Sequence, residues 1–277
     1  MNTKSRGGVS DRLVVLSANC QGLRNYNKRV DVLSYLKETN ASIACLQDTH
    51  LLESDKASIK DIWPECFING TKTNSRGVAI LLNNNFEYSV LDIFKDDEGN
   101  IIQLIIDCGI FKLNLINIYG PNKDSPDFFK KVSDLSKNEK ADYVMICGDF
   151  NLVFNPDIDC QNYVRLNNPQ ARSTVLEMVD HLGLIDIFRY MNPNVKRYSW
   201  RKKNPIKQAR LDYILSSNSM IDIIDSCNIK PSYRSDHSII QVSICKTDFK
   251  FGRGTWKFNN SLLKNKEYLE LIHNVID

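Results

Sequence analysis

Short apolar runs recur along the chain at lengths and spacings that suit β-strands. They lie at residues 13–18, 42–46, 78–82, 101–106, 112–119, 143–147, 211–215, 223–229 and 238–244. Several are apolar at nearly every position, as in "AILL" and "YVMIC", which is typical of strands covered on both faces. The pattern therefore predicts sheets whose strands are mostly buried.

Three segments between these runs show helical periodicity instead. In "KRVDVLSYLKET" apolar residues recur at three-residue steps from Val30 to Leu36, which places them on one helix face. "SPDFFKKVSDLSKN" begins with Ser125 as N-cap and Pro126 at the first helical position. "RSTVLEMVDHLGLIDIF" carries an apolar stripe, and Gly183 is a plausible stop. Since the short turn "DCGIF" also predicts a hairpin, we expect an α/β sandwich with mixed sheets.

Composition limits the classes of function. The 277 residues are 42% hydrophobic and 25% charged, which fits a globular protein with one large domain, and the net charge of +3 does not by itself indicate nucleic-acid binding. The eight cysteines form no CxxC pair and lie mostly in apolar runs, so we expect buried thiols rather than disulfides or a zinc site. No membrane span or signal peptide is recognisable, and we expect a soluble intracellular protein.

The two ends of the chain differ from its middle. Residues 1–11 are polar and are predicted to form a tail, whereas residues 12–245 carry the strands and helices of the predicted domain. Residues 246–277 begin as a charged linker and finish in an amphipathic helical pattern that has little to bury against by itself. We therefore expect this last segment to lead into a further region of a longer protein.

Polar side chains lie directly at the ends of the predicted strands. They are Asn19, Asp48, Tyr119, Asn122, Asp149, Asn151, Asp212, Asp236 and His237. Each alone is most often a turn or surface residue. Together they supply hard oxygen ligands for Mg²⁺, a histidine, a carboxylate able to orient it, and neutral donors for a phosphoryl oxygen. The set therefore points to hydrolysis of a phosphodiester.

The ordered motifs "LSANCQGL", "LQDTH", "RGVAILL", "NIYGPN", "GDFN", "RLDYIL" and "SDHS" resemble those of the endonuclease/exonuclease/phosphatase superfamily of pancreatic deoxyribonuclease and the apurinic endonucleases. Within it, "LQDTHLL", "RGVAILL", "NIYGPN" and "GTWKFNNSLL" are most similar to the endonuclease domain of long interspersed, non-LTR retrotransposons. The resemblance spans roughly residues 12–263. It implies a deoxyribonuclease-like, four-layer α/β sandwich, with two mixed β-sheets packed face to face and flanked by helices.

The resemblance implies that Asn19, Asp48 and Asp236 bind Mg²⁺, and that Tyr119 and Asn122 contact the scissile phosphate. Asp48 departs from the family, which usually has Glu at this position. Aspartate is shorter by about 1.5 Å, and Mg²⁺ tolerates little error around its ligand distances of about 2.0–2.1 Å. Either the strand end moves inward, or a water bridges, or another metal such as Mn²⁺ is favoured.

The resemblance also implies the catalytic roles. Asp149 would position or deprotonate the attacking water, and Asn151 would donate a hydrogen bond to the transition state. His237, oriented by Asp212, would stabilise the developing charge on the phosphate, as a charged imidazole beside a carboxylate can. Whether Asp149 or His237 is the general base stays open at this point.

The segment "KRYSWRKKNPIKQAR", residues 196–210, contains seven basic residues and no acid. Its candidate DNA contacts are Lys196, Arg197, Tyr198, Trp200, Arg201, Lys202, Lys203, Lys207 and Arg210. A basic run of this kind is a solvated loop about as often as it is a binding surface, but this one directly precedes Asp212. The resemblance implies that it forms a hairpin that enters a groove of target DNA.

Other basic residues are predicted to add to this surface, namely Arg24, Lys28, Arg29 and Arg76. Arg165 and Arg172 flank a second loop after "GDFN" and are predicted to contact DNA on the other side. Two histidines receive no ligand role from the motifs. We expect His50 and His181 to be structural or exposed.

The function implied by the resemblance is a Mg²⁺-dependent DNA endonuclease that nicks one strand of double-stranded target DNA. The resulting 3′-hydroxyl would prime reverse transcription by a downstream reverse transcriptase domain. The protein would act in the nucleus after translation in the cytoplasm, without a membrane, and as a monomer when isolated as a domain. Three alternatives stay open: an abasic-site repair endonuclease, an enzyme acting on phospholipids or inositol phosphates, and a DNA-docking module with weakened catalysis.

Overall fold

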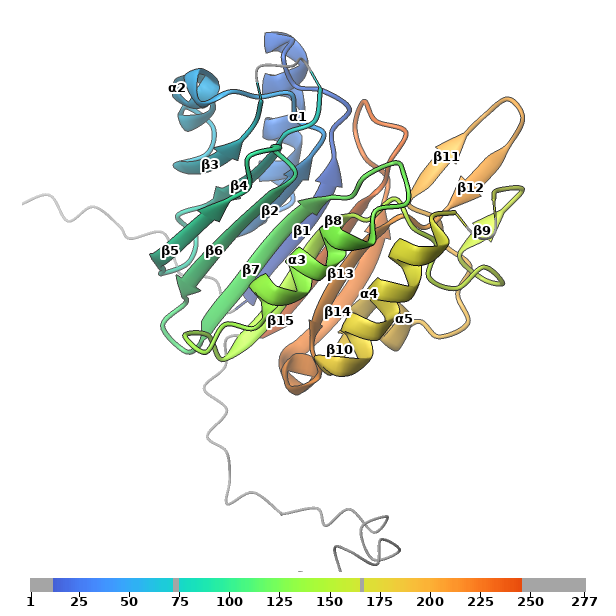
Figure 1. Cartoon of the computed structure of the whole chain (residues 1–277). Helices are drawn as coiled ribbons and strands as arrows, with labels where there is room; N and C mark the ends of the chain where they lie inside the picture. The colour runs from blue at the N-terminus through green and yellow to red at the C-terminus, as the bar shows by residue number, and fades with distance from the viewer. Residues whose placement is uncertain (1–11, 72–74, 165–166, 246–277) are drawn as a thin grey trace, which may run out of the picture. The chain divides into compact units, whose positions relative to one another are not determined.

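Two β-sheets pack face to face in the computed structural model, and helices cover their outer faces (Figure 1). The structure describes residues 12–71, 75–164 and 167–245, so the predicted tail 1–11 and the predicted linker and helical segment 246–277 lie outside the described residues. The order helix, sheet, sheet, helix confirms the predicted four-layer α/β sandwich.

The first sheet has six strands in the order β14–β15–β1–β2–β4–β3. They are β1 (Arg12–Asn19), β2 (Ile43–Gln47), β3 (Glu65–Asn69), β4 (Val78–Leu82), β14 (Ile224–Lys230) and β15 (Ile239–Cys245). Strands β1 and β2 are parallel and are connected by helix α1 (Tyr26–Glu38), whereas the other neighbours are antiparallel.

The second sheet repeats this plan in the order β10–β13–β8–β7–β6–β5. Its strands are β5 (Ser89–Lys95), β6 (Ile101–Asp107), β7 (Lys112–Tyr119), β8 (Tyr143–Asp149), β10 (Leu184–Asp186) and β13 (Asp212–Ser217). Here β7 and β8 are the parallel pair, and helix α3 (Pro126–Ser136) connects them. A small third sheet contains β9 (Cys160–Gln161), β11 (Trp200–Lys202) and β12 (Lys207–Ala209).

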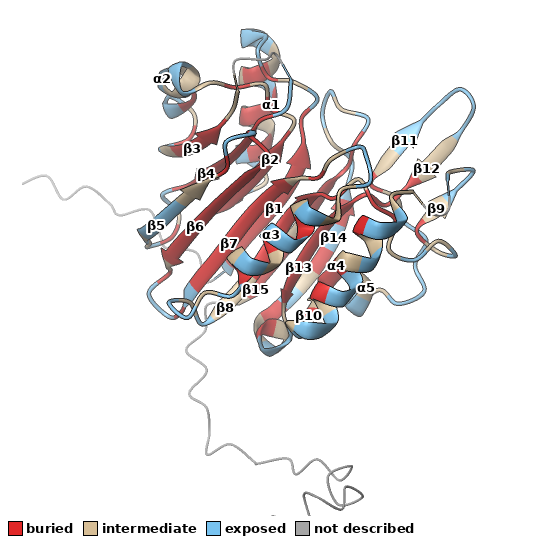
Figure 2. Ribbon diagram, in the orientation of Figure 1, coloured by how far each residue is buried: buried red, intermediate tan, exposed pale blue. Residues whose placement is uncertain are grey.

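Three hydrophobic cores hold the four layers together. One lies between the sheets, where residues such as Val15 and Leu104 are fully buried. A second lies between the first sheet and α1, which contributes Leu33, and a third lies between the second sheet and the helices α3 and α4 (Pro169–His181), which contribute Phe129 and Val175. The central strands are therefore covered on both faces (Figure 2), as their continuous apolar runs predict.

All nine predicted strand runs and all three predicted helices are present, with ends that shift by a few residues. Pro126 is the first residue of α3, and Gly183, with a φ of +58°, follows the end of α4. The chain after Gly183 forms β10 and a short helix α5 (Ile187–Met191) rather than continuing α4. Three further short elements, α2 (Lys56–Lys60) and the 3₁₀ turns at Glu53–Asp55 and Asn218–Ile223, were not predicted, nor were the strands β3 and β5.

All eight cysteines fall among the described residues and are free thiols, six of them buried, as predicted from their apolar surroundings. Among the helices of residues 12–245 that the structure describes, none combines the length and apolar character needed to span a bilayer.

Candidate active site at the ends of the central strands

The central strands of both sheets end at the same edge of the sandwich, and the register brings their polar residues together. Asn19 pairs with Gln47 at the end of the β1–β2 ladder, and Tyr119 pairs with Asp149 at the end of the β7–β8 ladder. Because β13 runs antiparallel to β8, its first residue, Asp212, lies opposite Asp149. The segment before β15 reaches the same edge, since β15 is antiparallel to β1.

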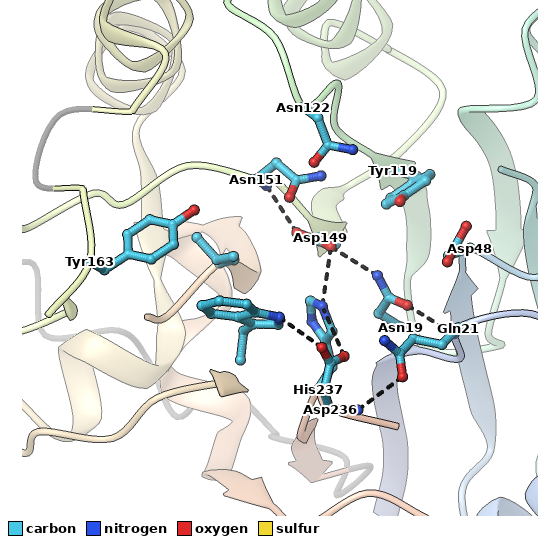
Figure 3. Close-up of a pocket in the computed structure, with 12 residues that line it drawn as sticks. Asn19, Gln21, Asp48, Tyr119, Asn122, Asp149, Asn151, Tyr163, Asp236 and His237 are labelled. Atoms are coloured by element: carbon cyan, nitrogen blue, oxygen red, sulfur yellow. Dashed lines mark hydrogen bonds and ion pairs between the residues drawn. The ribbon is translucent and has the colours of Figure 1, made fainter. Parts of the chain in front are cut away.

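A cavity of about 230 Å³ opens at this edge (Figure 3). It is lined by Asn19, Gln21, Asp48, Tyr119, Asn122, Asp149, Asn151, Tyr163, Trp200, Leu211, Asp236 and His237. Every residue predicted to bind metal or phosphate or to act in catalysis lines the cavity except Asp212, which lies behind His237 and contacts its ring. Gln21, Tyr163 and Leu211 also line it and were not predicted.

His237 and Asp212 form a buried pair in which Nδ1 of the imidazole lies 2.8 Å from Oδ2 of the carboxylate. The side chains of His237 and Asp212 are 8% and 1% exposed. Burial lowers the pKa of His237, but the carboxylates of Asp212, Asp149 and Asp236 outweigh burial and raise this pKa to about 10. The imidazole is therefore a cation at neutral pH.

Asp149 faces the other ring nitrogen, with Oδ2 3.8 Å from Nε2 of His237. Its Oδ2 accepts a hydrogen bond of 2.9 Å from Nδ2 of Asn19, and its Oδ1 accepts one of 2.9 Å from the backbone N–H of Asn151. Burial and the nearby charge of Asp212 raise the pKa of Asp149 to about 7. Asp149 can therefore exchange a proton near neutral pH.

Tyr119, Asn122 and Asn151 offer hydrogen-bond donors to the cavity. Burial and the carboxylates of Asp48 and Asp149 raise the pKa of Tyr119 well above its usual value, so the phenol keeps its proton. The nearby amide of Asn122 lowers the pKa of Tyr119 slightly but does not offset this rise. Nδ2 of Asn151 donates to the carbonyl oxygen of Gly120 at 2.7 Å, and its second N–H can serve a ligand.

Asp48, Asp236 and Asn19 provide the oxygen atoms that suit a divalent cation. Oδ2 of Asp236 accepts a hydrogen bond of 2.9 Å from Nε1 of Trp200, and Oδ1 of Asp48 lies 2.9 Å from Nε2 of His50. Each carboxylate thus has one oxygen beside a protein donor, and the other oxygen of Asp236 lies 3.8 Å from Nε2 of His237. Two carboxylates and an amide oxygen on one cavity therefore fit a hard metal ion.

Within the described part of the chain, Asp149, Asp212 and His237 also form a compact group whose potential ligand atoms lie within 4.8 Å of one another. The imidazole of this group is held at Nδ1 by Asp212 and carries a positive charge. A charged imidazole has no lone pair for a metal, so we interpret this group as catalytic.

His50 does more than the sequence indicated. It was expected to be structural or exposed, but it contacts Asp48, and both residues adopt left-handed backbone conformations with φ of +56° and +49°. This contact depends on the conformation of the turn after β2, for which the sequence gives no signal beyond the spacing of the two residues. His181 is exposed on α4, as expected.

The basic segment forms the β11–β12 hairpin, which projects past the edge of the sheets (Figure 1). Lys196, Arg197, Arg201, Lys202 and Lys203 are exposed, while Tyr198, Trp200 and Lys207 are partly buried. At the root of the hairpin, Oγ of Ser199 accepts the N–H groups of Leu211 and Asp212 at 3.0 Å each, and its carbonyl accepts the N–H of Ser238 at 2.6 Å. The hairpin is thereby bonded to both segments that carry the His237–Asp212 pair, at the start of β13 and just before β15.

The prediction that Arg210 contacts DNA is wrong. Its side chain is 1% exposed, and its Nε and Nη2 donate to the two oxygens of Asp159 at 2.9 Å each, while Nη2 also lies 2.6 Å from Oδ2 of Asp186. The guanidinium lies over the ring of Tyr213, 4.4 Å from its centroid. Arg29 is also buried, so it too cannot extend the DNA surface.

The other predicted basic residues divide between exposed and structural positions. Arg24 and Arg76 are exposed. Lys28 and Arg172 donate to backbone carbonyl oxygens of neighbouring loops. Arg165 lies outside the described residues.

This chain matches one protein family over most of its length and is similar in sequence to a transposon protein and to a bacterial enzyme. The family described as "Endonuclease/Exonuclease/phosphatase family" matches residues 16–237. The "Transposon TX1 uncharacterized 149 kDa protein" of Xenopus laevis is 26% identical over 266 residues, which are 94% of this chain and 20% of that protein. An "Exodeoxyribonuclease" of Bacillus subtilis (strain 168) is 27% identical over 260 residues, which are 83% of this chain and 98% of that enzyme.

Solved structures share the fold. The catalytic domain of APE2 from Xenopus laevis superposes with a TM-score of 0.72 at 19% identity, over 84% of this chain and 92% of that domain. The chain thus spans about a fifth of the transposon protein but nearly the whole of the bacterial enzyme.

Proposed function

Since the chain belongs to the Endonuclease/Exonuclease/phosphatase family, we propose that it is a Mg²⁺-dependent DNA endonuclease that nicks one strand and leaves a 3′-hydroxyl. Membership of the family makes it a hydrolytic enzyme of the nuclease and phosphatase class. The observation that carries the proposal is the buried Asp212–His237–Asp149 group, because its His237 and Asp149 line the same cavity as the carboxylates of Asp48 and Asp236.

The pKa values support Asp149 rather than His237 as the proposed base. His237 is cationic near neutral pH, because its pKa is about 10, so it cannot accept a proton from water. Asp149, with a pKa of about 7, takes the proton of the attacking water. His237, held by Asp212, stabilises the negative charge that develops on the phosphoryl oxygens.

The remaining residues orient the phosphate. Tyr119, Asn122 and Asn151 donate hydrogen bonds to its oxygens from the opposite side of the cavity. Asp48, Asp236 and Asn19 would hold the divalent cation, which neutralises charge on a phosphoryl oxygen when it is bound. Mn²⁺ can replace Mg²⁺ in this oxygen-rich site.

The finer proposal concerns the role of the nick. The 3′-hydroxyl primes reverse transcription by a reverse transcriptase domain of a longer protein, which acts on chromosomal DNA in the nucleus. Its support is the similarity to the transposon TX1 protein, of which this chain spans 20%, and the exposed basic hairpin at the edge of the cavity. As an isolated domain the chain acts as a monomer on double-stranded DNA.

One observation favours a second candidate, an abasic-site repair endonuclease. Tyr163, Trp200 and Leu211 form an apolar corner of the cavity beside the catalytic group, with the two aromatic rings 5.5 Å apart. Such a corner can accept a sugar that lacks its base. Cleavage of an abasic duplex much faster than intact DNA supports this candidate over the first.

The test is nicking of supercoiled plasmid with Mg²⁺, with Mn²⁺ and with EDTA. We expect metal-dependent conversion to open circles whose ends a DNA polymerase extends, strong loss in Asp149→Asn and His237→Ala, and no loss in the exposed control His181→Ala. Nicking in EDTA, or full activity of both active-site variants, contradicts the proposal. DNA binding by the wild type without nicking supports the docking-module alternative.

A further inference from the structure

The carboxylate of Asp48 is held by a side chain that does not itself line the cavity. Nε2 of His50 lies 2.9 Å from Oδ1 of Asp48, and Asp48 lines the cavity, whereas His50 is not among its lining residues. We propose that His50 is a positioning residue that fixes the Asp48 carboxylate for a divalent cation. The inference rests on the proposed function, in which Asp48 binds the metal.

The turn that joins the two residues is built to bring their side chains together. Asp48 and His50 both adopt a positive φ, which L-residues rarely do, and Thr49 between them is fully buried. The backbone is held on both sides, since the N–H of Thr49 donates to the carbonyl of Gly77 at 2.9 Å and the N–H of Gly22 donates to that of Asp48 at 2.7 Å. A disfavoured conformation fixed this firmly indicates that the placement of these side chains matters.

The imidazole is also confined on its other side. Gly22 has a φ of +76°, and a Cβ at this position would lie 2.9 Å from Nδ1 and 3.2 Å from Cε1 of His50. The ring therefore occupies space that only a glycine leaves, between the backbone of Gly22 and the carboxylate of Asp48. Both its position and its orientation are fixed before a metal arrives.

This arrangement gives the two oxygens of Asp48 different roles. The hydrogen bond from His50 occupies Oδ1 and restricts rotation of the carboxylate, which leaves Oδ2 for the cation. A partner of this kind affects metal binding strongly, because loss of one typically costs about 10–100-fold in metal affinity.

The experiment measures Mn²⁺ affinity of the DNA-free domain by calorimetry or electron paramagnetic resonance. His50→Ala is expected to weaken binding by about 10–100-fold, and His50→Gln, which retains an N–H donor, to weaken it less. His181→Ala is the matched control and should bind as the wild type does. In a double-mutant cycle, Asp48→Asn combined with His50→Ala should bind no more weakly than Asp48→Asn alone.

A pair of glycine variants tests the same idea with both side chains in place. Gly22→Ala puts a methyl group against the imidazole and should weaken Mn²⁺ binding. Gly109→Ala imposes a similar backbone penalty, with a φ of +85°, but a Cβ there meets nothing within 4 Å, so binding should be unchanged. Thermal unfolding of each variant shows that the fold is retained.

Three outcomes overturn the inference. If His50→Ala binds Mn²⁺ as tightly as the wild type, His50 does not position Asp48. If the losses of affinity add in the double mutant, His50 is an independent ligand of the metal. If the KM for DNA rises while the metal affinity is unchanged, His50 contacts the phosphate instead. A wild type that binds Mn²⁺ but does not nick DNA refutes the proposed function instead, and leaves the positioning role of His50 standing if the affinity changes are found.

Discussion

The site contains two pairs of carboxylates that differ in their burial and in what holds them in place. Asp149 and Asp212, the buried half, lie at the ends of strands and their side chains are 2% and 1% exposed. Asp48 and Asp236, the open half, lie on turns and are 19% and 36% exposed. The strand register fixes the buried half, whereas hydrogen bonds from His50 and Trp200 hold the open half.

The difference follows from what each half must do. Charges interact more strongly in a buried environment, so the buried half can keep His237 cationic and Asp149 near a neutral pKa. In the proposed function a metal ion and a DNA phosphate enter and leave, and this requires carboxylates that water can reach. We therefore expect changes in the buried half to affect the chemical step, and changes in the open half to affect metal binding.

The largest effect is expected from Asp149→Asn. Removal of the base should lower the nicking rate at saturating Mg²⁺ by about 10²–10⁴-fold, with a much smaller change in Mn²⁺ affinity. Single-turnover nicking and calorimetry measure the two quantities separately. Equal losses of nicking rate and of Mn²⁺ affinity would show that the buried half and the open half do not have separate roles.

Asp48→Ala should show the reverse pattern, with metal affinity reduced by about a hundredfold or more, beyond the loss expected for a supporting partner. Asp48→Glu keeps a carboxylate and should change rate and metal preference by less. Titration of nicking activity with Mg²⁺ and with Mn²⁺ compares the two variants. A wild-type response in Asp48→Ala would remove the metal role.

Asp212→Asn should act through the imidazole. With one carboxylate fewer to oppose burial, the pKa of His237 should fall from about 10 toward or below its ordinary value of 6.5. Nicking at neutral pH should then fall by about 10²-fold, the lower end of the range for a group in proton transfer. NMR titration of the His237 ring in EDTA measures the pKa. An unchanged pKa would show that Asp212 is not what holds the charge.

The smallest effect is expected outside both halves. Lys202→Gln and Lys203→Gln should each reduce the slope of log affinity against log salt by about 1, and leave the rate at saturating DNA unchanged. Lys137→Gln is the control, because this exposed residue follows α3 near the start of β8, at the opposite edge of the sheet. A loss of rate at saturation would place these lysines in the chemical step.

The sequence predicts all four carboxylates, but it indicates what holds the buried half better than what holds the open half. Buried strands have continuous apolar runs, and a polar residue such as Asp149 at the end of one is conspicuous. The contact between His50 and Asp48 depends on two left-handed residues, and no sequence pattern indicates them. Tyr163 lies in an irregular loop and reaches the cavity only through the fold.

Arg210 shows a second limit of sequence reasoning. It lies in a run of basic residues and looks like its neighbours, but its partner Asp159 is 51 positions earlier in the chain. A buried ion pair between residues distant in the chain leaves no local signal in the sequence. A buried arginine therefore cannot be told from an exposed lysine in the same basic run. Charge runs therefore need the fold before each member can be assigned.

Ser199 marks the boundary between the root of the β11–β12 hairpin, which is bonded to the site, and its tip, which is not. Its hydroxyl and carbonyl bind the backbone of Asp212 and Ser238, so the root of the hairpin belongs to the catalytic scaffold. Residues 203–206 at the tip are exposed and lie outside that bonding. Substitutions at the tip can therefore change which DNA the hairpin contacts in the proposed function, while the hydrogen bonds that position Asp212 and His237 stay the same. The choice of target can then change without a change in the catalytic site.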